Sequence, residues 1–80
     1  MPLFIRKQIE AELRDRLARQ EPLDSVLMWL GKTGTTVGEA IDMLEENGMT
    51  REYAEHVLTA HPDWAPLITL LGGIAGEQLP

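Results

Sequence analysis

Five short segments of helical periodicity, each closed by Gly or Pro, constrain the fold of this 80-residue chain more than any other feature. Apolar residues recur every four positions in 3–20, and at i, i+3, i+4 and i+7 in the later segments, which places them on one face of a helix. Pro22, Gly31, Gly48 and Pro62 separate the segments. Half-buried strands would instead show strict alternation, which we do not find. The pattern predicts an all-α fold, a compact bundle of about five short helices.

The expected helix boundaries rest on local signals. Pro22 suits the first turn of the second helix, Thr36 and Glu39 form a capping box for the third, and Asn47-Gly48 is a left-handed stop. We expect the side chains of the core to include Ile5, Ile9, Leu13, Leu17, Leu23, Val26, Leu27, Leu30, Val37, Ala40, Ile41, Leu44, Tyr53, Ala54, Val57, Leu58, His61, Trp64, Leu67, Ile68 and Leu71.

The last two helices are predicted in the same way. Thr50 is the expected N-cap of the fourth helix and Asp63 that of the fifth, which Gly72-Gly73 would close. The whole chain, 1–80, is then one domain, with two helices in 1–31, a three-helix unit in 36–73 and a loose tail in 74–80. A chain this short buries only about 60% of its unfolded surface, so a partner protein or a homodimer would add stability.

Charge is divided unevenly along the chain, whose net charge is −6. Residues 1–20 carry five basic and three acidic side chains, whereas residues 21–80 carry two basic and ten acidic ones. Nucleic-acid binding depends on clustered Lys and Arg, so the acidic part of the chain would be repelled by phosphate. We therefore expect no direct binding to nucleic acid.

The residues that carry chemistry are few. The chain has no Cys, its two histidines, His56 and His61, are five residues apart, and its single Ser25 lies far from both. A metal site needs three or four converging ligands, and a nucleophile needs an adjacent base. The stretch Gly31–Thr33 resembles part of a phosphate-binding loop, but the required first glycine is replaced by Val26. We expect no catalytic residues, no metal, no cofactor and no enzymatic activity.

The chain offers no segment suited to spanning a membrane. Its longest apolar stretch, 64–76, is interrupted by Pro66, Thr69 and three glycines. No leader-like segment opens the sequence, and the absence of Cys fits a reducing compartment. These features predict a cytoplasmic protein with no membrane partner.

The segment around Gly48 has the order of a helix-turn-helix unit, with the turn glycine, the apolar Met49 and the N-cap Thr50. The would-be recognition helix offers Arg51 beside acidic residues such as Glu52, so a scaffold for protein contacts is favoured over direct DNA binding. Two nucleic-acid-linked alternatives stay open: a weak helix-turn-helix protein, and an acidic mimic that occupies the DNA-binding groove of another protein.

The segment Ile41–Leu58 also resembles the ubiquitin-associated (UBA-like) three-helix fold. The spacing from Ile41 through Gly48 to Ala54 and Leu58 agrees with that family, and 63–71 would be its third helix. Asn47 stands where Met is usual and Met49 where an aromatic residue is usual. The resemblance implies a partner-binding surface made of the loop between the first two helices and the end of the third, formed here by Asn47, Gly48, Met49, Leu70 and Leu71.

Composition, charge and resemblance together predict a small acidic protein-protein interaction module without catalytic activity, such as an adaptor, an inhibitor or a regulatory subunit. Its expected partner is another protein.

Overall fold

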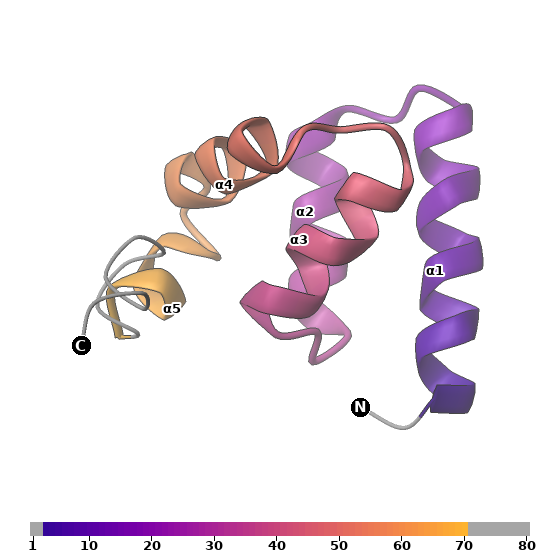
Figure 1. Ribbon diagram of the computed structural model, residues 1–80, viewed down its shortest axis with the longest axis horizontal. Coiled ribbons are helices and arrows are strands. Elements are labelled where there is room, and N and C mark those ends of the chain that lie inside the picture. The colour runs from indigo at the N-terminus through magenta and orange to yellow at the C-terminus, as the bar shows by residue number, and fades with distance from the viewer. Residues whose placement is uncertain (1–2, 71–80) are drawn as a thin grey trace.

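The computed structural model describes residues 3–70, which form five α-helices and no strand (Figure 1). The helices are α1 (Leu3–Ala18), α2 (Leu23–Lys32), α3 (Val37–Glu46), α4 (Arg51–Ala60) and α5 (Ala65–Leu70). The predicted all-α bundle of about five short helices is confirmed.

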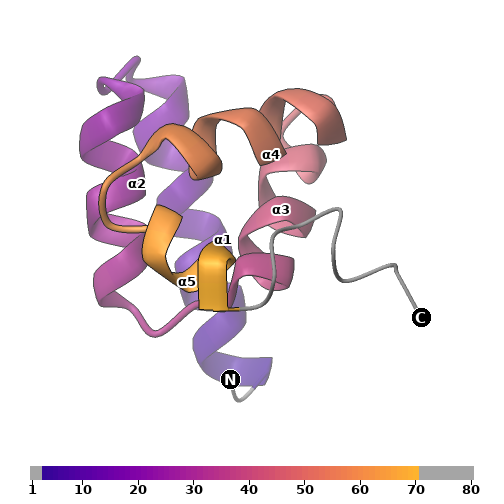
Figure 2. The ribbon, with the colours of Figure 1, turned by 90° about the vertical axis from the view of Figure 1, so that its left-hand side faces the viewer.

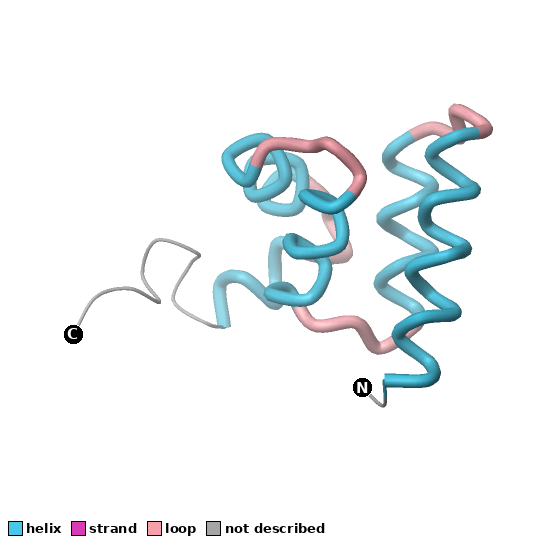
Figure 3. The backbone as a smooth tube through the Cα atoms, turned by 45° about the vertical axis from the view of Figure 1, so that its right-hand side comes forward, coloured by secondary structure: helices cyan, strands magenta, loops and turns pink. Residues whose placement is uncertain are grey.

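The helices are arranged with α1 and α5 on opposite sides of α2 and α3 (Figure 1). Figure 2 looks onto α5, with α1 behind α2 and α3. The first two helices form an antiparallel hairpin, which Figure 3 shows side by side. Helix α4 lies at the end of the molecule where α2 begins (Figure 1), and one of its faces looks toward α2.

The corner between α1 and α2 is stabilised by a polar cluster around Arg16. Its guanidinium bonds to the carboxylates of Glu12 and Glu21, each at 2.8 Å, and lies 4.6 Å from the centre of the Trp29 ring. Ser25 donates a 2.9 Å hydrogen bond to Glu21. This bond, helped by Arg16, lowers the pKa of the Glu21 carboxyl below its ordinary value. The hairpin therefore joins its helices through both charge and cation–π contact.

The predicted caps of the middle helices are confirmed. The Thr36 hydroxyl accepts from the Glu39 amide at 3.2 Å and the Glu39 carboxylate accepts from the Thr36 amide at 3.0 Å, which closes the capping box. This amide bond lowers the pKa of Glu39. Thr50 caps α4 by accepting from the Tyr53 amide at 3.1 Å. Between these helices, Gly48 has a φ of 93°, the expected left-handed stop.

The predicted N-cap of the last helix, Asp63, is wrong. Residues 62–64 form a turn and α5 begins at Ala65, with the Ile68 amide donating to the Trp64 carbonyl at 3.1 Å. The Asp63 amide instead donates to Nδ1 of His61 at 3.1 Å. The late start has a tertiary cause, because the indole of Trp64 is held by the carbonyl of Leu27 at 2.9 Å.

The core lies between the five helices and agrees with most of the predicted faces. Three predicted members, Ile5, Tyr53 and Leu67, are exposed instead, and Leu71 lies outside the described residues. A repeat of four residues drifts by about 40° per step around a helix, which turns Ile5 away from the bundle. The buried apolar side chains are Ile9, Leu13, Val26, Leu27, Leu30, Val37, Ala40, Ile41, Met43, Leu44, Ala54, Leu58, Trp64 and Ile68.

We expect Gly48→Ala to destabilise the fold by about 1 kcal/mol, because an L residue is strained at this positive φ. An added methyl group would meet no atom within 4 Å, so steric clash does not contribute. Gly38→Ala is the matched control, since the methyl group meets no atom there either and Gly38 lies inside α3. It should leave stability unchanged or raise it. Urea denaturation followed by circular dichroism measures both, and equal effects would contradict the strain.

Candidate functional site

Helix α4 carries two neighbouring apolar faces, one buried in the core and one at its margin, where Val57 packs against the core. Ala54 and Leu58 are fully buried and face the bundle. Tyr53, Val57 and Ala60 follow at i, i+4 and i+7 on the adjacent face, where Tyr53 is 51% exposed. The second face leaves α4 with apolar surface open to the outside.

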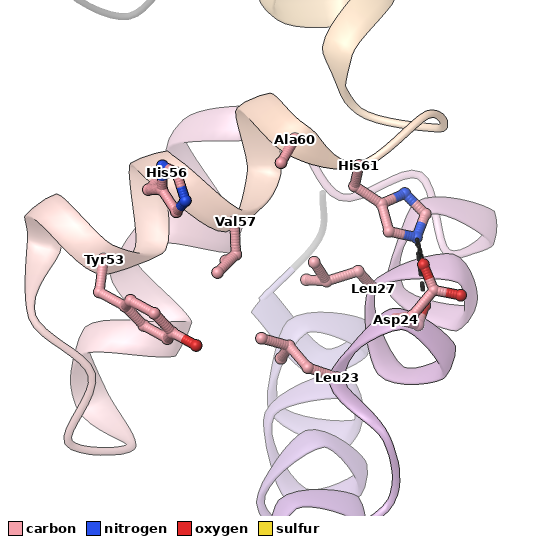
Figure 4. Close-up of a pocket in the computed structure, with 8 residues that line it drawn as sticks. All are labelled: Leu23, Asp24, Leu27, Tyr53, His56, Val57, Ala60 and His61. Atoms are coloured by element: carbon pink, nitrogen blue, oxygen red, sulfur yellow. Dashed lines mark hydrogen bonds and ion pairs between the residues drawn. The ribbon is translucent and has the colours of Figure 1, made fainter.

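This second face forms one wall of a depression of about 310 Å³ between α2 and α4, which we call the α2–α4 groove. Figure 4 shows the side chains of Leu23, Leu27 and Val57 pointing into the space between the helices, with the Tyr53 ring at one end. The residues that line the groove are Leu23, Asp24, Leu27, Tyr53, His56, Val57, Ala60 and His61. Its walls are apolar and its polar groups lie at the edges, as in many binding sites.

The far end of the groove is closed by His61, whose side chain is 5% exposed. Because the Asp63 amide donates to Nδ1, the ring proton lies on Nε2. Nε2 is 3.2 Å from the carbonyl oxygen of Asp24 and 3.1 Å from its Oδ1, so it donates toward α2. The Asp24 side chain itself is 80% exposed. The histidine thus ties the end of α4 to the start of α2 and positions an accessible carboxylate beside the groove.

A second depression, of about 440 Å³, begins on the other side of Tyr53; we call it the loop depression. It is lined by Leu17, Asn47, Gly48, Met49, Thr50 and Tyr53. Leu17 comes from the end of α1, and Met49 is partly buried and packs against the core. Since Tyr53 lines both hollows, they adjoin at this residue and form one surface.

The residues predicted from the family resemblance are only partly brought together. Asn47, Gly48 and Met49 share the loop depression, whereas Leu70 ends α5, at the far side of the molecule from that loop (Figure 1). Leu71 lies outside the described residues. The loop half of the predicted surface is therefore continuous with the groove.

The structure does not support phosphate binding by α4, the recognition helix of the helix-turn-helix interpretation. Arg51 is the basic residue of α4, and it bonds to the Glu45 carboxylate at 3.2 Å. Glu52 is exposed beside it. A duplex approaching α4 would meet one arginine already paired and an exposed acid, which disfavours phosphate contact.

No group of three His, Asp or Glu side chains within residues 3–70 converges as metal ligands would. No helix in that range has the length and apolar character needed to cross a membrane.

Comparisons with protein-family models, with curated proteins and with solved structures found no match to this chain.

The sequence shows the apolar residues that α4 contributes to the groove, but their periodicity does not distinguish them from the core face of the same helix. Tyr53, Val57 and Ala60 lie one position from the Ala54 and Leu58 stripe, so α4 reads as a single broad apolar face. Which half of this face is buried and which is open depends on how closely α2 approaches α4. The local sequence pattern does not predict that spacing. The exposure of Asp24 and the burial of His61 depend on the same approach.

Proposed function

We propose that this chain is a small acidic protein-interaction module without catalytic activity, acting as an adaptor, an inhibitor or a regulatory subunit. The observation that supports this most is the open apolar surface formed by the α2–α4 groove and the loop depression, with half-exposed Tyr53 between them. Tyrosine supplies much contact area at little entropic cost and is enriched at the energetic centres of interfaces.

Contiguous apolar surface on a small protein marks a contact site more often than an accident of packing. Here the surface draws on four separate parts of the fold: the end of α1, the start of α2, the loop between α3 and α4, and the outer face of α4. An open surface of this kind suits a protein partner better than a small molecule, which requires an enclosed pocket.

A site-specific photo-cross-linker tests the proposal. We place a benzophenone amino acid at Tyr53 of the full chain, and at exposed Asp42 on α3 as the control. The Tyr53 position should give a discrete cross-linked product in extracts of the native cells, and Asp42 should not. Adding Ala60→Lys, which places a long side chain in the groove, should remove the product. Equal products from both positions, or a product that persists with Ala60→Lys, would overturn the proposal.

A further inference from the structure

The shape and charge of this surface point to one class of occupant. We propose that the α2–α4 groove and the loop depression together bind a cationic amphipathic helix of another protein, with two apolar anchors placed on either side of Tyr53. This inference rests on the proposed function, because it specifies the partner of the same surface.

The two adjacent hollows indicate a partner that presents two apolar anchors. Each is large enough for one or two apolar side chains, and the Tyr53 ring belongs to the lining of both. Anchors for adjacent hollows must come from a segment that repeats its apolar side chains over one to two turns. An amphipathic helix presents such anchors at i, i+3, i+4 and i+7, the usual mode of helix-in-groove recognition.

The charges around the surface favour a cationic partner. No Lys or Arg lines either hollow, whereas Asp24 lines the groove with its side chain 80% exposed. Glu52, beside Tyr53, and Asp63, two residues beyond His61, are also exposed. Within residues 3–70, neither of these two acids is in an ion pair with a basic side chain. The rim is therefore negative and available.

Three basic residues close in sequence to the lining residues are paired with acids. Arg16 bonds to Glu12 and Glu21, and Arg19 bonds to Asp15 at 3.1 Å. Arg51 bonds to Glu45. An incoming acidic helix would meet no Lys or Arg in the lining of either hollow, whereas Lys and Arg on the flanks of a cationic helix would meet the exposed carboxylates of Asp24, Glu52 and Asp63.

The same charges disfavour the other occupants. The segment 71–80 carries one charged side chain, that of Glu77, which a negative rim would repel. A second copy would have to offer its basic helix α1, where Ile9 and Leu13 are buried in its own core and Ile5 is exposed. The side chains of 5–18 thus expose one large apolar anchor where two are required, and 71–80 carries no basic residue.

The test uses a synthetic helix of about 15 residues with Leu at i, i+3, i+4 and i+7 and Lys at the remaining positions. Its binding to the full chain is measured by fluorescence anisotropy of the labelled peptide. We expect saturable binding that weakens as salt is raised from about 0.05 to about 0.5 M. The same peptide with Glu in place of Lys, and a shuffled Leu/Lys peptide with no apolar face, should not bind.

Matched variants locate the binding. Ala60→Lys fills the groove and should weaken binding at least about tenfold, whereas Thr59→Lys makes the same charge change on the neighbouring residue, which lies outside both linings. Asp24→Asn should weaken binding more than Asp42→Asn, which removes an acid on α3. Equal effects within either pair would show attraction by net charge alone and overturn the proposal.

The outcomes separate this inference from the function on which it rests. If Tyr53 cross-links a natural partner while the Leu/Lys helix fails to bind, the interaction module stands and the cationic helix is refuted. If the Glu peptide binds as well as the Lys peptide, the electrostatic part is refuted. If the full chain is shown by sedimentation to be a dimer that Ala60→Lys dissociates, the occupant is a second copy and the inference is wrong.

Discussion

Replacing Trp64 by Ala should lower the free energy of unfolding by about 3–5 kcal/mol, the largest effect we expect from any single substitution. Trp64 is fully buried, its indole nitrogen bonds to the Leu27 carbonyl at 2.9 Å, and its ring packs beneath Gly31. The substitution leaves a large cavity and removes the hydrogen bond together. In a domain of this size the loss approaches the whole stability.

Urea denaturation followed by circular dichroism measures this effect. Trp64→Phe separates its two parts, because it keeps most of the ring volume and loses the hydrogen bond; it should cost clearly less than Trp64→Ala. Leu67→Ala, on the same short helix but 43% exposed, is the control and should have a small effect. A loss for Leu67→Ala as large as that for Trp64→Ala would mean that α5 as a whole, and not the tryptophan, holds this end together.

Replacing His61 by Ala should cost about 2–3 kcal/mol. The imidazole is the only partner within the structure's described part for the Asp63 amide, and its loss also removes the bonds to Asp24. Asp24→Asn should cost far less, since that side chain is 80% exposed and the carbonyl oxygen of residue 24 remains to accept from the ring. Both variants are compared by the same urea denaturation.

If Asp24→Asn proved as costly as His61→Ala, stability at this end would come from the carboxylate and not from the buried ring. In that case Asp24 could not be used as a simple charge probe of the groove. The comparison therefore also validates the binding experiment.

The features of the fold that could be predicted from the sequence depend on interactions between residues within about one helical turn of each other. The Thr36–Glu39 capping box, the Thr50 N-cap and the left-handed Gly48 depend on neighbouring residues, and all are present. Asp63 had the composition of a cap, but the anchoring of Trp64 to α2 decided where the last helix begins.

The candidate site was harder to predict because it depends on spacing between helices. The loop residues Asn47, Gly48 and Met49 were selected from a family resemblance and do line a depression. Tyr53 was assigned to the core, since its apolar spacing is right for burial. Its exposure follows from the groove between α2 and α4, a property that belongs to the packing of two helices that begin 28 residues apart.

The two bonds between α2 and the turn after α4 have a kinetic consequence. His61 to Asp24 and Trp64 to Leu27 both join residues 37 positions apart, so they close the same loop of chain. Once either bond forms, the other needs almost no additional loss of chain entropy. The two contacts should therefore form together, after the local α1–α2 and α3–α4 pairs, and act as the final step that commits the chain to its native topology.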